Sequence, residues 1–158
     1  MKRIIASALA ASALTVAIGW SAATVSAQDK LAAVMNRRDT MKAQGAAMEG
    51  IKNYLDGKAD QAAAIKSADD LLRLCQSLPT KFPEGTSTDD FPGKSGAKPI
   101  IWTDWDKFIA GQKTMVARTD QLDAAVKSGD KKAVADDYAA VGKDGCGACH
   151  GTYRQKLS

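Results

Sequence analysis

The sequence is poor in histidine, cysteine and aromatic residues. Its 158 residues include one histidine and three cysteines, and aromatic residues make up 6% of the total. The single histidine, His150, excludes every site that requires two imidazole groups. The net charge is +4, but no basic cluster is interleaved with aromatic residues, so we expect no nucleic-acid partner. Acidic pairs such as Asp69–Asp70 are adjacent rather than spaced for acid–base catalysis, and we expect the protein not to be an enzyme.

Proline is also scarce, and all four prolines lie between residues 79 and 99. Three glycines share this segment, so it predicts a long loop rather than a helix or a strand. Phe82 and Phe91 are candidates to anchor the loop, and residues 86–90 predict a solvated turn.

The first 27 residues have the pattern of a cleaved signal peptide. Lys2 and Arg3 precede an Ala-rich apolar run over residues 4–20, and Val25-Ser26-Ala27 fits the small-x-small cleavage pattern. The mature domain is then expected to cover residues 28–158 and to be located in the periplasm. A retained anchor is the alternative, but small and polar residues interrupt the run, and no later segment could span a membrane.

Four segments of the mature chain have an apolar period typical of helices. In the first, Val34, Met41, Met48 and Leu55 repeat every seven residues. Segments of this length joined by short turns predict an all-α protein, an antiparallel four-helix bundle, to which the motif described next adds a covalently attached haem c. The expected helices cover residues 29–56, 59–78, 100–127 and 130–155.

The haem is indicated by the motif Cys146-Gly-Ala-Cys149-His150. C-x-x-C-H is the attachment sequence for haem c, in which both thiols form thioethers and the histidine ligates the iron. The alternatives are a zinc half-site, a dithiol redox pair and a structural disulfide. Zinc needs four ligands and only Cys75 remains, a βαβ pattern for a redox pair is absent, and a disulfide leaves His150 unexplained. We expect Cys75 to be a small buried residue.

Three stretches together resemble the class II c-type cytochromes, the cytochrome c′ family. The haem motif lies near the C-terminus and continues as Gly-Thr-Tyr153-Arg154. The first helix contains Arg37-Arg38-Asp-Thr-Met41-Lys-Ala-Gln-Gly45-Ala-Ala-Met48, and Lys98-Pro-Ile-Ile-Trp102 opens the third. The pattern of the first helix is most similar to the low-spin branch of the family, in which a methionine binds the iron.

This resemblance implies a role for several residues around one haem c per chain. His150 would be the proximal iron ligand, and Arg154 the basic residue beside it. Arg37 would pair with a haem propionate, and Met41 would face the distal side of the iron, as a ligand or only as a blocking group. Met48 is the second candidate for a distal ligand. Independently of the resemblance, Gly45 lies on the apolar stripe, where a flat group could press against the backbone.

Two functions are possible, depending on whether Met41 binds the iron on its distal side. With His150 and Met41 both on the iron, we expect an electron carrier that docks on redox partner proteins. With Met41 off the iron, we expect binding of nitric oxide or carbon monoxide, since no histidine is left to hydrogen-bond bound dioxygen. A haem-free bundle with a purely structural role is a third alternative. The resemblance also allows a homodimer through the first two helices.

Overall fold

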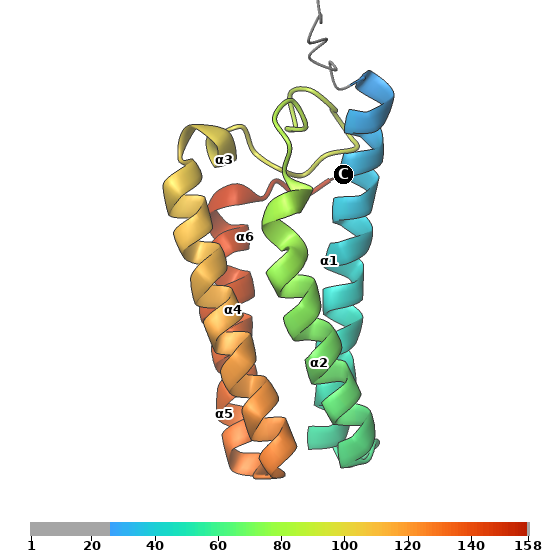
Figure 1. The fold of residues 1–158 in the computed structure, drawn as a ribbon, viewed down its shortest axis with the longest axis vertical. Helices are drawn as coiled ribbons and strands as arrows, with labels where there is room; N and C mark the ends of the chain where they lie inside the picture. The colour runs from blue at the N-terminus through green and yellow to red at the C-terminus, as the bar shows by residue number, and fades with distance from the viewer. Residues whose placement is uncertain (1–25, 158) are drawn as a thin grey trace, which may run out of the picture.

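The structure, a computed structural model, describes residues 26–157 (Figure 1). Long helices lie side by side along the length of the molecule, and the loop before α3 crosses one end of them. The elements are α1 (Ala27–Leu55), α2 (Gln61–Ser77), a 3₁₀ helix (Leu78–Lys81), α3 (Ile100–Thr103), α4 (Trp105–Ser128), α5 (Lys131–Ala140), a π-helical segment (Val141–Gly147) and α6 (Ala148–Tyr153). The predicted antiparallel four-helix bundle is confirmed.

Short turns join α1 to α2 and α4 to α5 at the other end of the bundle. Each turn contains a glycine in the left-handed region, Gly57 with φ of 74° and Gly129 with φ of 78°. Asp60 caps the start of α2 by accepting from Ala63 N, and Asp130 caps α5 by accepting from Ala133 N. These glycines and cap residues end one helix and start the next within a few residues. The two helices of each pair therefore run antiparallel.

The core consists of the apolar stripes that the helical period predicts. Val34 and Ile51 of α1, Leu122 of α4 and Val134 of α5 have no exposed surface. Cys75 of α2 is 1% exposed and carries a free thiol, as expected for a small buried residue.

Gly50 marks a close approach between α1 and α2. A Cβ atom there would overlap Ser67 Oγ and would lie 3.0 Å from Ser67 Cβ, which cannot move without the backbone. We therefore expect Gly50→Ala to lower the free energy of unfolding by about 1–3 kcal/mol, as overpacking does. Urea denaturation of the purified protein measures this change. Gly111→Ala is the control, because a Cβ there meets nothing within 4 Å; equal losses in the two variants would contradict the close packing.

The first two helices lie within two residues of their expected bounds, whereas the third and fourth are interrupted. The third expected helix is broken at Asp104, which separates α3 from α4 with φ of −120° and ψ of 36°. The fourth contains a π-helical segment and ends at Tyr153 rather than at Gln155. Three glycines occur in the π-helical segment, and one of them, Gly145, packs so closely on α4 that a Cβ would lie 3.1 Å from Met115 Cγ.

The expected solvated turn at residues 86–90 is wrong at its first two positions. Thr86 is fully buried and Ser87 is 5% exposed. Their polar groups are satisfied inside the protein, since Thr86 binds Arg37 and the Ser87 hydroxyl donates to Asp90 Oδ2 at 2.6 Å. The loop is therefore fastened to the bundle by hydrogen bonds.

Residues 1–25 of the expected signal peptide lie outside the described residues. Ser26 and Asp29 form a capping box at the start of α1. Within residues 26–157, none of the helices has the length and apolar character needed to cross a membrane.

Candidate haem-attachment site

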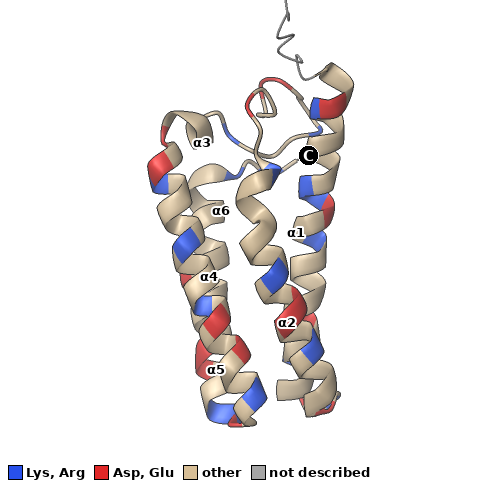
Figure 2. Cartoon of the chain, viewed as in Figure 1, with Lys and Arg blue, Asp and Glu red and all other residues tan. Residues whose placement is uncertain are grey.

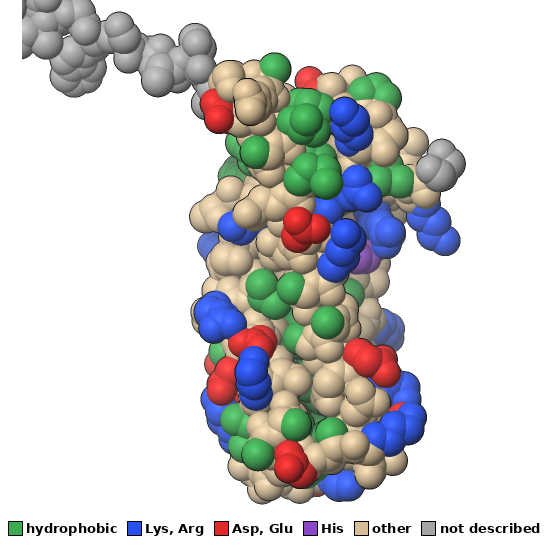
Figure 3. Space-filling model, turned by 90° about the vertical axis from the view of Figure 1, so that its right-hand side faces the viewer, with side chains coloured by type: hydrophobic (Ala, Val, Ile, Leu, Met, Phe, Trp, Pro, Cys, Tyr) green, Lys and Arg blue, Asp and Glu red, His purple; other side chains and the backbone are tan. Residues whose placement is uncertain are grey.

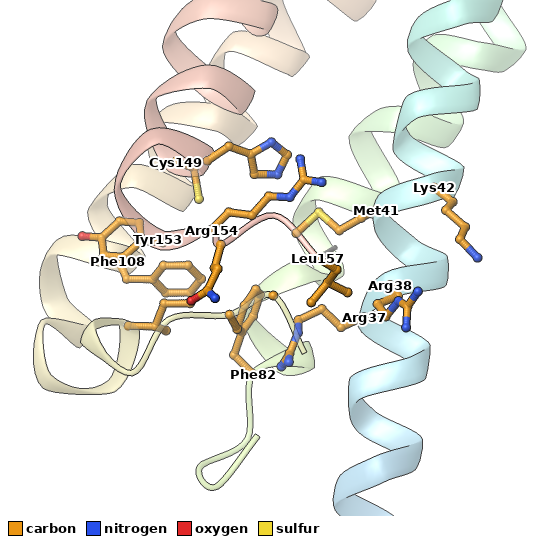
Figure 4. Close-up of a pocket in the computed structure, with 15 residues that line it drawn as sticks. Arg37, Arg38, Met41, Lys42, Phe82, Phe108, Cys149, Tyr153, Arg154 and Leu157 are labelled. Carbon is orange, nitrogen blue, oxygen red and sulfur yellow. The ribbon is translucent and has the colours of Figure 1, made fainter. Parts of the chain in front are cut away.

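One pocket of about 430 Å³ lies at the end of the bundle that the loop covers (Figure 4). Its walls come from α1 on one side and from α6 with the segment after it on the other, with loop and α4 residues between. The lining residues are Arg37, Arg38, Met41, Lys42, Phe82, Gly96, Ala97, Ile101, Phe108, Cys149, His150, Tyr153, Arg154, Gln155 and Leu157.

The α6 wall carries the motif residues Cys149 and His150, both half-buried. Burial, and secondly the charge of Arg154, lowers the pKa of His150, which favours the neutral imidazole that can bind a metal. Burial, and secondly the neighbouring Cys146, raises the pKa of Cys149 to about 11, so this thiol is protonated at neutral pH. Cys146 does not line the pocket; it is half-buried against the core, and burial also raises its pKa.

Both motif thiols are free, so the disulfide alternative is not formed in this structure. A zinc site is not supported by the structure. Among residues 26–157, no group of three or more His, Cys, Asp or Glu side chains is arranged to hold a metal ion.

The α1 wall carries Met41, whose side chain points from α1 toward α6 in Figure 4. Met41 and His150 therefore stand on different walls of the same pocket. Met48 packs against the core and does not line the pocket. Gly45 is exposed one turn after Met41, and a Cβ at this position would meet no atom within 4 Å.

Arg37 lines the pocket but has a second set of partners that the sequence did not indicate. Its terminal nitrogens donate four hydrogen bonds into the loop, to Lys81 O, Thr86 Oγ1, Thr86 O and Ser95 Oγ. The guanidinium also lies 4.8 Å from the centre of the Phe82 ring. Burial lowers the pKa of Arg37 to about 10. Since a guanidinium has five N–H donors, the Nε hydrogen remains for the expected propionate, and that pairing stays a prediction.

The charged side chains that line this pocket are all basic. Arg37, Arg38, Lys42 and Arg154 line it, whereas no Asp or Glu does. Arg154 lies close enough to His150 to lower its pKa, in agreement with its expected place beside the histidine. A haem supplies two carboxylates to this basic pocket, so the charge of the lining fits the group.

Aromatic and aliphatic side chains supply the remaining walls. Phe108 packs on Phe82 with ring centres 4.8 Å apart and on Tyr153 with ring centres 5.3 Å apart. Ile101 and Leu157 also line the pocket. The helical period marks Phe108 and Ile101 as buried, but no sequence signal indicates that they face this pocket.

Backbone pairing holds the α6 wall against the loop. Lys98 N donates to Tyr153 O at 3.0 Å, and Gln155 N donates to Gly96 O at 2.8 Å. Ala97 and Arg154 form an isolated antiparallel bridge between these bonds. The segment after the motif is thereby fixed to the loop that covers the pocket.

A helical bundle with a C-x-x-C-H motif, whose second cysteine and histidine line an apolar, basic pocket, has the features of a c-type cytochrome. Residues 32–154 match the sequence model of the family described as Cytochrome C'. The chain belongs to the cytochrome c′ family, whose members carry one covalently attached haem c per chain. Cys146 and Cys149 are the residues able to form the thioethers, and His150 is able to ligate the iron.

Relatives of two kinds are similar to this chain. A cytochrome c′ from Pararhodospirillum photometricum is 31% identical over 120 residues, which cover 75% of this chain and 93% of the relative. A cytochrome c-556 from Agrobacterium tumefaciens (strain II Chrys) is 32% identical over 125 residues, covering 78% of this chain and 97% of the relative.

Solved structures agree with this assignment. The nitric oxide complex of a cytochrome c′ variant from Alcaligenes xylosoxidans has a TM-score of 0.70 at 26% identity, covering 80% of this chain and 97% of that one. A cytochrome c′ described as having ligand-controlled dimer dissociation has a TM-score of 0.73 at 22% identity, with coverage of 80% and 97%. Cytochromes of this fold thus include a dimer.

Proposed function

We propose that this protein is an electron carrier whose haem c iron is ligated by His150 and Met41. The observation that carries the proposal is that Met41 and His150 line the same pocket from different walls. An imidazole and a thioether are the ligand pair of many electron-transfer cytochromes, because this pair raises the reduction potential and remains bound in both oxidation states. The haem supplies the one-electron chemistry.

The chain supplies the surroundings of the haem. Burial keeps His150 in its neutral, ligating form. Phe108 packs on both Phe82 and Tyr153, and the three rings form an apolar part of the pocket wall. No Asp or Glu lines the pocket, and electron transfer is proposed without a catalytic residue.

Binding of nitric oxide or carbon monoxide is the second candidate function. The comparisons favour it more than the first, because a structurally similar cytochrome c′ is a nitric oxide complex and most of the similar curated proteins are named cytochrome c′. In this candidate Met41 stays off the iron and only limits access to it. Three of the similar curated proteins are instead named cytochrome c-556. Their sequence identity to this chain is similar to that of the cytochrome c′ relatives.

Optical spectra with carbon monoxide separate the two candidates. With Met41 on the iron, the ferrous protein is low-spin and its spectrum is unchanged by carbon monoxide, whereas Met41→Ala becomes high-spin and binds the gas. Met48→Ala is the matched control, since Met48 does not line the pocket, and it is expected to keep the parent spectrum. A parent protein that is high-spin and binds carbon monoxide would reject methionine ligation and support gas binding.

Export to the periplasm and dimer formation belong to the same proposal. Export is supported by the signal pattern of residues 1–27 and by haem c attachment, which takes place outside the cytoplasm in organisms with this kind of signal. A homodimer through α1 and α2 is supported by the dimeric cytochrome c′ of similar fold.

A further inference from the structure

Basic side chains gather at the mouth of the haem pocket. Figure 3 shows several Lys and Arg side chains around the single histidine, with an acidic side chain beside them and mixed basic and acidic side chains over the lower half of this face. These residues come from α1, from the loop and from the segment after α6. Arg38, Lys42 and Arg154 line the pocket, Lys94 accepts a hydrogen bond from Arg38 at its backbone carbonyl, and Lys156 lies in the chain between two lining residues. We call these five residues the mouth cations.

Hydrogen bonds fix these three parts of the chain to one another. Arg38 Nη1 donates to Lys94 O at 3.3 Å, which joins α1 to the loop. Gln155 N donates to Gly96 O at 2.8 Å, which joins the segment after α6 to the same loop. The mouth cations are therefore held on one surface by the fold, although they are far apart in the sequence.

Most of the mouth cations have no acidic partner. Lys42 is paired with Asp39 at 3.5 Å, and both side chains are exposed. The other four make no salt bridge with any residue that the structure describes. Elsewhere on the bundle basic and acidic residues alternate along the helices (Figure 2), and pairs such as Lys66–Asp70 and Lys132–Asp136 are closer than 3 Å.

The haem does not account for all of this charge. Its two propionates neutralise two basic groups at most, and Arg37 is one more candidate for that role. Leu157 lies at the pocket between these charges and is 37% exposed. An exposed apolar side chain within a rim of like charges has the composition of a small, transient docking surface.

We infer that the mouth cations form the docking surface for an acidic redox protein. Opposite charges attract the two proteins over distance and raise the rate of association without requiring a large contact area. The surface includes the pocket mouth, so the partner would dock where the haem is attached. This inference rests on the proposed electron-transfer function, and the test below separates the two.

Small redox ions of opposite charge test the sign of the surface. At about 10 mM ionic strength, where screening extends to about 30 Å, the ferrous protein passes one electron to hexacyanoferrate(III), giving ferric protein and hexacyanoferrate(II). We expect Lys94→Glu/Lys156→Glu to slow this reaction about tenfold, the lower range of electrostatic steering. Hexaammineruthenium(II) is a cation that reduces the ferric protein and is itself oxidised to hexaammineruthenium(III). This second reaction should be faster in the double variant than in the parent protein.

The control changes the net charge equally but away from the mouth. Lys113→Glu/Lys131→Glu alters exposed residues of α4 and α5 that have no acidic partner in the part of the chain that the structure describes. We expect less than a twofold change in either reaction for this variant. Equal effects in the two double variants, or no effect in either, would overturn the docking surface.

Binding of a glutamate-rich peptide separates this inference from the proposed function. NMR shifts of the ferrous protein should be confined to residues near the mouth cations, and they should disappear in Lys94→Glu/Lys156→Glu. Binding of the peptide does not depend on which group is the sixth ligand of the iron. The optical spectrum reports that ligand independently. Shifts spread over the whole bundle would reject the docking surface even if Met41 ligates the iron.

Discussion

Replacing both Cys146 and Cys149 with serine is expected to abolish covalent haem attachment completely. The motif thiols are the attachment points that the C-x-x-C-H sequence predicts, and both are free in the structure. Mass spectrometry of the denatured protein should show the mass of one haem on the parent chain and none on the double variant. Each single variant should keep at most one thioether, with a lower yield of attached haem.

Cys75→Ala is the matched control for this experiment. Cys75 is 1% exposed, and its sulfur accepts hydrogen bonds from Gln44 Nε2 at 3.5 Å and Thr119 Oγ1 at 3.7 Å. Burial raises the pKa of this thiol to about 11, so it is an unreactive core group. Full haem attachment in Cys75→Ala is therefore expected; a loss equal to that of the motif variants would show that Cys75 takes part in attachment.

Arg37→Ala is expected to destabilise the protein by about 3 kcal/mol or more. Its side chain is 4% exposed and donates four hydrogen bonds into the loop. Without it, Thr86 Oγ1 and Lys81 O lose their donor, and Thr86 O and Ser95 Oγ each lose one of two donors. A buried acceptor left unsatisfied costs about 1–3 kcal/mol. Urea denaturation measures the stability, and hydrogen exchange of the amides of residues 82–97 shows whether the loop is released.

Two variants control for the charge and for the position of Arg37. Arg38→Ala removes an adjacent arginine with one hydrogen bond of 3.3 Å to Lys94 O, and we expect a loss below about 1 kcal/mol. Arg37→Lys keeps the charge but cannot supply the planar fork of donors, so an intermediate loss is expected. A loss in Arg37→Ala no larger than in Arg38→Ala would contradict the anchoring role.

The bundle could be predicted because burial repeats along its helices. Val34 and Ile51 in α1, and Leu122 and Val126 in α4, are spaced at helical period, and all four are fully buried. Glycine and aspartate are ordinary signals of a helix end and a helix start, and Gly57 and Gly129 turn the chain while Asp130 caps α5. The π-helical segment could not be predicted, because a change in backbone hydrogen bonding leaves no characteristic residue pattern.

The candidate site could be predicted only where a local motif describes it. The spacing of Cys146, Cys149 and His150 carries its chemistry within five residues, and a resemblance was needed to place Met41 opposite them. The partners of Arg37 were missed because Thr86 and Ser95 are 49 and 58 residues away, in a loop without periodicity. Contacts of this kind depend on how the loop folds over the bundle, which composition does not encode.

The two walls of the pocket have a consequence for the biogenesis of the protein. Met41 belongs to the first helix to be synthesised, whereas Cys149 and His150 belong to the last, and Gln155 completes the pairing with Gly96 after them. A nascent chain that lacks residues 146–155 can form the contacts of α1 with α2 but has no second wall. Haem can therefore be attached at this motif only after most of the bundle has been synthesised.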